Sequence, residues 1–442
     1  MLNNPFCYTP SPSIVEAARQ LMARIDTTPS LRALFSEGKM LGVLEVEIPD
    51  QVGDDDNVMP GSTGHLFLFA FSGLAGGNAF VEGFVPPIFV WKPEDIIASS
   101  PEESRRLQDW LFEQYIVTNG RGERRSIRQL FADRGLVPPG GTGDCAAPKL
   151  LQYALTHGLK PLAIGEFWYG ASPTREVRRH GAFYPACTGK CGPLLGYMLQ
   201  GVDVEPNPLE SDAHWHLADP VVRYEDASLI VVDKPAGMLA VPGRPIPGVP
   251  PRRSLQDWLS AYCSSSETHT PILACHRLDM DTSGLMVFAK TPEVQAALQQ
   301  QFEHREVTKS YLALVMPAEI GQTPLKPGDH GKISLPLAPD WYDRPRQRVD
   351  SVHGKPAVTE YEVLHATPTG ALLLRLIPYT GRTHQLRVHC AHCAGLGQPI
   401  VGDRLYGGSQ ADRLMLHAAY LSFRYPGDGR RLTFESHMTF NP

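Results

Sequence analysis

The spacing of hydrophobic residues predicts alternating helices and strands in the first part of the chain. Apolar residues recur at helical intervals over residues 13–25, whereas residues 41–48 and 64–71 alternate or run apolar as strands do. The same criterion predicts further helices in three later segments, at residues 108–115, 126–132 and 149–157. We therefore expect an α/β domain in this part.

The second part of the chain carries a different pattern. Residues 229–233 and 284–290 are short apolar runs typical of buried strands, and residues 357–365 and 371–377 form a second such pair. A helix is expected to begin after Thr291, because threonine is a good N-cap, Pro292 suits the first turn and Glu293 favours the helix dipole. Several strands with few helices indicate an α+β arrangement.

The boundary between the two parts lies in a segment that contains two prolines. Glu205-Pro-Asn-Pro208 is followed by a polar stretch and then by the new apolar run at residues 229–232. We therefore divide the chain into an N-terminal extension, residues 1–215, and a C-terminal domain, residues 216–442. A Pro- and Gly-rich stretch at residues 137–143 marks a less distinct boundary inside the extension.

The composition is that of an ordinary globular protein. Of 442 residues, 42% are hydrophobic and 20% are charged, and no apolar run approaches the roughly 20 residues needed to cross a bilayer. The first residues lack the basic and apolar regions of a signal peptide, and eight irregularly spaced cysteines suit reduced thiols. These features predict a cytoplasmic protein without a membrane partner.

The net charge of −6 is unevenly distributed. Residues 216–442 contain 23 Lys and Arg against 22 Asp and Glu, so the acidity lies in residues 1–215, which contain 18 and 25. Local basic runs such as Arg344-Pro-Arg-Gln-Arg348 lie in the C-terminal half. Such a run can follow the phosphates of a nucleic acid, or it can be a solvated loop.

A dense polar cluster precedes one of the buried strands. His276, Arg277, Asp279 and Asp281 lie on the loop that leads into residues 284–290, and ionisable groups beside a core are costly unless they are paired or used. A structural salt-bridge turn would explain any one of them but explains the set poorly. Asp281 lies two residues from Asp279 on an extended loop, so their side chains face opposite ways and we interpret Asp281 as a structural acid.

A second polar cluster, at residues 379–389, follows another apolar strand. Thr383 is expected to cap the next helix, on which His384 and Arg387 lie on neighbouring faces. An arginine that points from a helix at a carboxylate would keep that acid ionised. An ordinary polar helix face is the alternative interpretation.

Taken in order, six segments of the C-terminal half resemble the RluA-type family of pseudouridine synthases. Between about Arg223 and Phe423 they are Leu229-Ile-Val-Val-Asp-Lys-Pro-Ala-Gly-Met238, His276-Arg-Leu-Asp-Met-Asp-Thr-Ser-Gly284, Lys309-Ser-Tyr-Leu-Ala313, Gly381-Arg-Thr-His-Gln-Leu-Arg-Val-His389, Pro399-Ile-Val-Gly-Asp403 with Leu405-Tyr-Gly407, and Leu414-Met-Leu-His-Ala418. Any one segment could arise by chance, but the ordered set is specific.

The resemblance implies a mixed, largely antiparallel sheet flanked by helices and an enzyme that isomerises uridine in structured RNA. The substrate would be a tRNA anticodon stem-loop or a large-subunit rRNA loop, turned out of its stack, and neither metal nor cofactor is needed. We expect a monomer. The resemblance assigns catalysis to Asp279, Tyr311 and Arg387, and substrate binding to Arg277, His276, Arg382 and His384.

The cysteines allow several interpretations. Cys145 follows a Gly-rich stretch at the start of a helical segment, where a thiol is activated, and Cys187 and Cys191 follow later. These three are inert buried thiols, a zinc site completed by His157 or His180, or the site of a reactive nucleophile. Near the C-terminus Cys390 and Cys393 resemble half a zinc site, but packing explains them better.

The extension carries no motif that assigns a reaction, and we expect it to contribute to the choice of RNA substrate. Two other functions stay open for the chain. One is a two-activity fusion in which Cys145 makes the extension a second enzyme. The other is an RNA-binding ribosome-assembly factor with a vestigial isomerase site, although the complete set of Asp279, Tyr311 and Arg387 argues against it.

Overall fold

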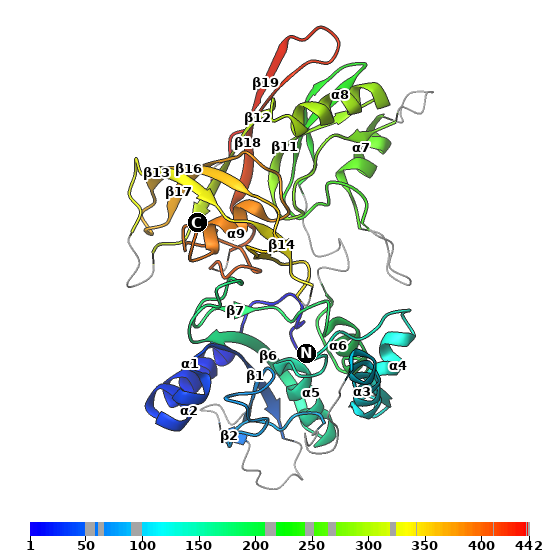
Figure 1. Cartoon of the computed structure of the whole chain (residues 1–442), viewed down its shortest axis with the longest axis vertical. Helices are drawn as coiled ribbons and strands as arrows, with labels where there is room; N and C mark the ends of the chain where they lie inside the picture. Colours follow the sequence, from blue (N-terminus) through cyan, green and yellow to red (C-terminus); the bar gives the residue numbers. More distant parts are fainter. Residues whose placement is uncertain are drawn as a thin grey trace. The chain divides into compact units, whose positions relative to one another are not determined.

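The computed structural model of the chain consists of two compact units (Figure 1). It describes residues 1–48, 58–60, 66–89, 100–207, 218–243, 252–263, 271–318, 324–341, 343–409, 411–438 and 440. The N-terminal unit comprises Met1–Pro173, Arg178–Asn207 and Pro339–Arg346, and the C-terminal unit comprises Thr174–Val177, Pro208–Ala338 and Gln347–Pro442. Each unit therefore includes a short piece of chain from the other side of the main boundary.

The N-terminal unit is an antiparallel sheet covered by helices. Its strands, in sheet order, are β2 (Val58–Pro60), β3 (Leu66–Phe71), β1 (Lys39–Glu47), β6 (Lys160–Tyr169) and β7 (Phe183–Tyr184). Its helices are α1 (Pro12–Thr27), α2 (Pro29–Phe35), α3 (Pro101–Gln114), α4 (Ile127–Ala132), α5 (Ala146–Thr156) and α6 (Gly192–Met198), and β4 (Ile116–Thr118) pairs with β5 (Arg124–Ser126). The predicted α/β character of this part is confirmed.

Both faces of this sheet are buried because successive strand residues point to opposite sides. Leu41 and Val43 of β1 pack with α1 and α2, whereas Leu44 and Val46 pack with α5. Figure 1 shows α1 and α2 on one side of the sheet and α5 on the other. The sheet is thus the middle of three layers.

The C-terminal unit is built on a ten-stranded sheet. Eight of its strands, in sheet order, are β13 (His330–Ser334), β16 (Val358–Ala366), β17 (Leu372–Pro378), β12 (Thr308–Val315), β18 (Leu416–Arg424), β11 (Ser283–Ala289), β9 (Leu229–Lys234) and β8 (Val221–Glu225). β10 (Leu273–Ala274) pairs with β11, β19 (Arg431–Glu435) pairs with β18, and β14 (Leu337–Pro339) pairs with β15 (Gln347–Val349). Its helices are α7 (Leu255–Cys263), α8 (Pro292–Glu303) and α9 (Gln385–Ala391).

Helices cover both faces of the sheet where the central strands are most apolar. Val231 of β9 packs in the cluster that contains Leu298 of α8, whereas Val232 packs with Leu259 of α7. β11 and β18 are parallel, while the other pairs are antiparallel. A Cβ atom at Gly284 would lie 2.3 Å from the Ala418 carbonyl oxygen, so only glycine permits this close parallel pairing. The predicted mixed, largely antiparallel sheet is confirmed.

Most predicted elements occur within a few residues of their expected bounds, and Thr291 caps α8 by accepting the Val294 N–H. The helix expected at residues 108–115 begins earlier, at Pro101, because Ser100 caps it through the Glu103 N–H. Residues 64 and 65 of the strand expected at 64–71 lie outside the described residues.

One predicted cap is wrong. Helix α9 begins after His384, not Thr383, and His384 makes no side-chain cap bond. Its φ of 52° places the backbone in the left-handed region, and the residue is buried.

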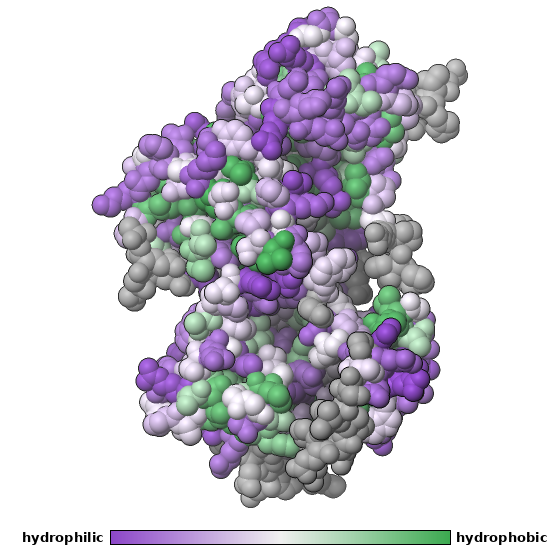
Figure 2. Space-filling model, viewed as in Figure 1, coloured by the Kyte–Doolittle hydropathy of each residue, from purple (hydrophilic) through white to green (hydrophobic). Residues whose placement is uncertain are grey.

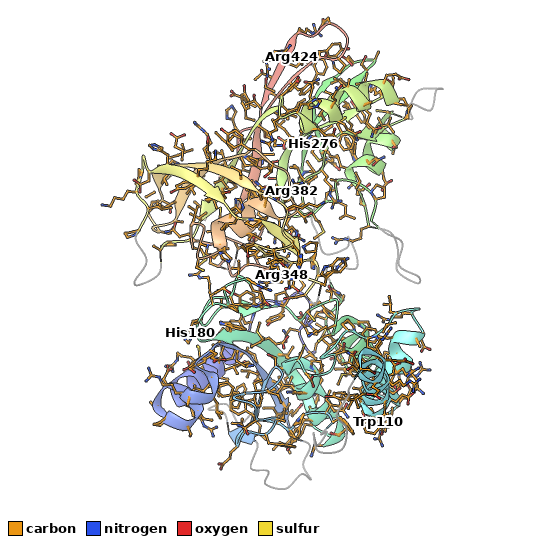
Figure 3. All side chains as sticks on the ribbon, in the orientation of Figure 1. Trp110, His180, His276, Arg348, Arg382 and Arg424 are labelled. Atoms are coloured by element: carbon orange, nitrogen blue, oxygen red, sulfur yellow. The ribbon has the colours of Figure 1, made fainter. Side chains whose placement is uncertain are left out.

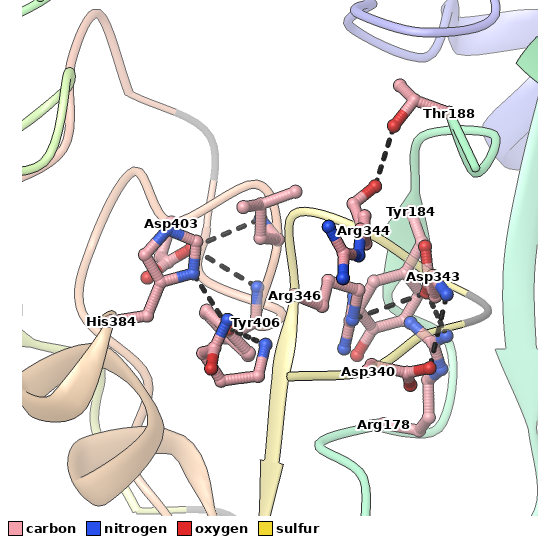
Figure 4. Close-up of polar contacts among 12 residues, drawn as sticks. Arg178, Tyr184, Thr188, Asp340, Asp343, Arg344, Arg346, His384, Asp403 and Tyr406 are labelled. Atoms are coloured by element: carbon pink, nitrogen blue, oxygen red, sulfur yellow. Dashed lines mark hydrogen bonds and ion pairs between the residues drawn. The ribbon is translucent and has the colours of Figure 1, made fainter. Parts of the chain in front are cut away.

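The basic run at residues 344–348 contains a buried arginine. Arg346 is 3% exposed and pairs with Asp343, which also pairs with Arg178 within the N-terminal unit (Figure 4). Arg348 pairs with Asp350. A side chain this buried does not reach a phosphate, so Arg346 is structural, whereas Arg344 in the same run is exposed.

Figure 2 shows that the visible face of the C-terminal unit is mostly hydrophilic, most densely over β19 and α8. Within the described part of the chain, no helix is long and apolar enough to cross a membrane.

A four-residue segment from before the main boundary completes the core behind α9. Val177 is 3% exposed and packs in the cluster that contains Val388 of α9 and Tyr406. The Thr174 and Arg175 carbonyls accept hydrogen bonds from His392 Nε2 and the Val349 N–H, at 3.0 Å each. The C-terminal unit therefore depends on chain that precedes residue 216.

We expect Val177→Ala to lower the free energy of unfolding by about 2 kcal/mol, because it removes two buried methyl groups and leaves a cavity. Thermal unfolding of the full chain measures the effect. Val137→Ala is the matched control, because Val137 is 80% exposed and its truncation should change little. Equal melting temperatures for the two variants would show that the segment adds no packing energy.

Candidate active site

A cavity of about 510 Å³ in the C-terminal unit is lined by residues of both polar clusters singled out in the sequence. It is lined by the loop before β11, the end of α8, the start of β12 and the loop that leads into α9. All seven residues proposed from the sequence line it: His276, Arg277, Asp279, Tyr311, Arg382, His384 and Arg387. Figure 3 labels His276 and Arg382, which come from the first and second cluster respectively.

Asp279 lies on the loop between β10 and β11 with its side chain 22% exposed. Burial raises the pKa of its carboxyl above the ordinary value, and the positive charges of Arg387 and Arg277 act against this rise. Asp281 is not among the lining residues, as the alternation of an extended loop predicts. The loop thus offers a single carboxylate to the cavity, in a partly dry and positively charged setting.

Arg387 is held in place by a second acid. It is 4% exposed on α9, and its Nε and Nη2 donate to the two carboxylate oxygens of Asp403 at 2.7 Å each. Its remaining Nη1 lies 3.9 Å from Asp279 Oδ2. Because a guanidinium is planar, the two-point bond to Asp403 fixes the direction in which Nη1 points.

Asp403 is in turn fixed by its own surroundings. It accepts the backbone N–H groups of Leu405 and Tyr406 at 3.1 Å each (Figure 4). Burial acts to raise its pKa, but the charge and hydrogen bonds of Arg387 outweigh burial and hold the pKa below the ordinary value. The pair is therefore ionised at neutral pH.

His384 supports the same arrangement rather than opening freely into the cavity. Its Nδ1 lies 2.9 Å from the Tyr406 hydroxyl, which also accepts the Gln347 N–H at 2.7 Å (Figure 4). The Tyr406 ring in turn packs against the Arg387 guanidinium, 5.3 Å from its centroid. His384 therefore lines the cavity and also contacts Tyr406, the residue that packs against the Arg387 guanidinium.

Tyr311 lines the same cavity as Asp279. It lies on β12, directly after an irregularity in the pairing with β18 between Ser310 and Tyr311. Burial and the Asp279 charge both raise the pKa of its hydroxyl, so the phenol stays protonated at neutral pH. Its ring contacts the cores on both sides of β12, which leaves it little freedom to turn.

His276 is a neutral wall residue. Burial, with a contribution from Lys309, lowers its pKa to about 3. Its Nε2 accepts the Val287 N–H at 3.2 Å, and its ring stacks on Phe302 with centroids 4.5 Å apart. These contacts fix the imidazole edge that lines the cavity.

Most of the charged residues in the lining are basic. Arg277, Arg305 and Arg382 are exposed, and Lys309 lies over the Phe302 ring at 5.4 Å. Glu303 is the one carboxylate besides Asp279 among the described lining residues. Positively charged side chains around Asp279 favour the binding of a polyanionic ligand. One uncharged group of that ligand would enter the cavity.

Two supporting residues were not singled out by the sequence analysis. Asp403 orients Arg387, and Lys234 is 1% exposed and donates to the carbonyls of Pro235, Met238 and Met280 at 2.8–2.9 Å. Met280 follows Asp279 in the sequence, so the hydrogen bond from Lys234 holds the loop that carries Asp279 against β9. Both residues lie in segments that carry the family resemblance, and this resemblance was the only sign of a role in the sequence. Their partners could not be predicted because they are distant in sequence.

Among the described residues, one group of three or more potential ligands converges as a metal site requires, and it lies outside this cavity: Cys145, Cys187 and Cys191. Cys390 is fully buried and Cys393 is exposed, while His389 and His392 use both ring nitrogens in hydrogen bonds. Packing therefore accounts for the segment at residues 389–393.

Comparison with known proteins identifies relatives of the C-terminal half. A family described as RNA pseudouridylate synthase matches residues 228–392. The dual-specificity RNA pseudouridine synthase RluA of Vibrio vulnificus is 43% identical over 213 residues, which is 46% of this chain and 78% of that protein. The protein of the same name from Haemophilus influenzae is 40% identical over 223 residues, which is 50% of this chain and 93% of the relative.

A solved structure, human RNA Pseudouridylate Synthase Domain Containing 1, is also similar. It is 29% identical, covers 54% of this chain and 88% of its own, and superposes with a TM-score of 0.39. The family match leaves residues 1–227 outside its bounds.

Proposed function

The chain belongs to the RNA pseudouridylate synthase family, and we propose that its C-terminal unit isomerises uridine to pseudouridine in structured RNA with Asp279 as the essential carboxylate. The observation that carries this proposal is the cavity in which one acid, Asp279, faces Arg387 and Tyr311 within a basic lining.

The chemistry requires little beyond this set of side chains. The bond from the ribose to the base nitrogen breaks, the base rotates, and the ribose rejoins the base through carbon. That carbon then loses its proton, and the released nitrogen gains one. No electron is gained or lost overall, so an acid that serves as nucleophile or base suffices. The target base must leave its stack to reach Asp279, and a cavity of about 510 Å³ is large enough for one extruded pyrimidine.

Arg387 and Tyr311 have complementary roles in this proposal. Arg387 keeps Asp279 ionised and aimed, because burial alone would favour the protonated acid. Tyr311 stacks on the extruded base and offers a protonated hydroxyl for the proton transfer.

The basic lining supports a structured RNA as substrate. Arg277, Arg305 and Arg382 can contact phosphates on both sides of the extruded nucleotide, which gives affinity but little sequence information. The relatives bear the name dual-specificity RNA pseudouridine synthase. This name supports action on more than one RNA, and the two we propose are a tRNA anticodon stem-loop and a large-subunit rRNA loop.

For the N-terminal unit we propose a contribution to RNA selection, so that this unit changes which RNA is modified rather than the reaction. A vestigial isomerase site is disfavoured because the acid, the arginine and the tyrosine line one cavity.

The decisive experiment maps pseudouridine in total RNA from cells with and without the gene, after carbodiimide treatment. We expect one or more positions in tRNA or large-subunit rRNA to lose the modification and to regain it with the wild-type gene. Complementation with Asp279→Asn should fail. No changed position in either RNA class would refute the proposal.

We expect Tyr311→Phe to bind RNA within a few-fold of wild type and to turn over roughly 10²-fold more slowly, because the ring still stacks but the hydroxyl is gone. Single-turnover kinetics and filter binding with the same stem-loop separate the two effects. Tyr420→Phe is the control, since Tyr420 lies on β18 and does not line the cavity. Wild-type rates for Tyr311→Phe would mean that the hydroxyl has no role.

A further inference from the structure

We propose that the N-terminal unit binds one zinc ion through Cys145, Cys187 and Cys191, that a water molecule takes the fourth position, and that Glu166 lies beside this water. This inference is independent of the isomerase, because every residue in it belongs to the N-terminal unit.

Three thiols from distant positions converge on one point. Cys145 precedes α5, Cys187 lies in the loop after β7, and Cys191 precedes α6, yet their sulfur atoms all lie within 4.8 Å of one another. Zinc–thiolate bonds of about 2.3 Å in tetrahedral geometry place sulfur atoms about 3.8 Å apart. A closure of about 1 Å therefore brings the three sulfurs onto a zinc ion.

The local backbone favours thiolates at this point. Cys145 is the N-cap of the eleven-residue helix α5 and makes no side-chain cap bond, so its sulfur is available to a metal at the positive end of the helix. The backbone N–H groups of Lys190 and Cys191 donate to the Cys187 sulfur. Such N–H donors orient and stabilise metal-bound thiolates.

The histidines considered from the sequence do not complete the site. His157 Nδ1 lies 2.8 Å from the Tyr153 carbonyl oxygen, and its ring stacks on Tyr153. His180 Nδ1 accepts the Gly170 N–H at 3.0 Å. Neither belongs to the converging group, so among the described residues the protein supplies three ligands rather than four. Three protein ligands and an open position are the arrangement of catalytic zinc sites, whereas structural sites are closed by four.

Glu166 lies near the start of α5, where Cys145 is located. It is 7% exposed on β6, and its Oε1 accepts the Ala147 N–H at 3.0 Å, two residues beyond Cys145. The Tyr8 hydroxyl accepts the Glu166 N–H at 2.8 Å and so fixes its backbone. A fixed carboxylate beside a metal-bound water can accept its proton, which generates a hydroxide nucleophile near neutral pH.

The first experiment measures metal content in the purified full-length chain by mass spectrometry. We expect one zinc per chain for wild type and less than one-tenth of this for Cys145→Ser, Cys187→Ser and Cys191→Ser. Cys7→Ser and Cys393→Ser are the controls and should retain the ion, since neither sulfur belongs to the group. Loss of zinc from a control variant would overturn the assignment.

Because a cysteine variant can lose zinc through misfolding, cobalt(II) added to metal-stripped wild-type protein gives a second readout. Three thiolates in a tetrahedral site produce strong sulfur-to-cobalt charge transfer and intense visible bands. We expect both, with saturation at one equivalent. Wild-type protein that contains no zinc and binds neither zinc nor cobalt under reducing conditions would refute the proposal.

The open position is tested by X-ray absorption at the zinc edge. We expect three sulfur neighbours and one oxygen, and the same shell in Glu166→Gln, because Glu166 is placed beside the water rather than on the metal. Four sulfur neighbours, or loss of zinc from Glu166→Gln, would overturn the open site.

Discussion

Asp279→Asn is expected to reduce uridine isomerisation to background, a loss of at least about 10³-fold, while RNA affinity stays within a few-fold of wild type. The substitution preserves the shape of the side chain and removes the charge that serves as nucleophile or base. Affinity depends mainly on phosphate contacts, which the exposed cations of the lining provide. Single-turnover assays with a stem-loop, together with filter binding at fixed salt, measure both quantities.

Asp281→Asn is the matched control, because it makes the same change two residues away at a side chain that does not line the cavity. We expect it to retain turnover within a few-fold. If Asp281→Asn were inactive and Asp279→Asn active, the assignment of the essential acid would be reversed.

The raised pKa of Asp279 gives this prediction a pH dependence and a stability effect. The rate should fall on acidification at a pH above the value of about 3.9 expected for an exposed aspartate, because only the ionised form reacts. A raised pKa also means that the folded state binds the proton more tightly than the unfolded state, so ionised Asp279 lowers stability above that pKa. At neutral pH, Asp279→Asn should therefore melt at the wild-type temperature or higher.

Arg387→Met is expected to destabilise the chain and to abolish turnover together. It leaves the buried Asp403 carboxylate without the partner that donates two hydrogen bonds at 2.7 Å, and breaking such a pair costs about 3–5 kcal/mol. It also removes the nearest cation to Asp279, whose pKa should then rise further. Thermal unfolding and single-turnover kinetics measure the two losses.

The double variant Arg387→Met/Asp403→Asn separates the two effects. It removes both charges of the buried pair, while an amide oxygen in place of Asp403 Oδ1 can still accept the Leu405 and Tyr406 N–H groups, so we expect most of the lost stability to return. Turnover should not return, because Asp279 still lacks its cation. A stable and active double variant would show that Arg387 acts only on the fold.

The amino-acid sequence determined what is local in this protein. Hydrophobic spacing predicted α1, β1, β9 and β11, because the burial of one face fixes the period of a helix or a strand. The helix cap at Thr291 could be predicted because its hydrogen bond joins two residues, Thr291 and Val294, that lie only three positions apart. The two polar clusters were recognisable because one directly precedes and the other directly follows an apolar strand, and residues of both, including Asp279 and Arg387, line one cavity.

The tertiary structure decided every pairing between distant segments. Arg387 meets Asp403, Val177 packs behind α9, and Cys145 meets Cys187 and Cys191, all without any signal in residue spacing. His384 rather than Thr383 precedes α9, and its ring contacts Tyr406, a residue 22 positions away that the local preference for a threonine cap does not take into account. Such pairings arise from the packing of whole elements, whose relative positions depend on the sum of many contacts along the chain rather than on the residues that finally meet.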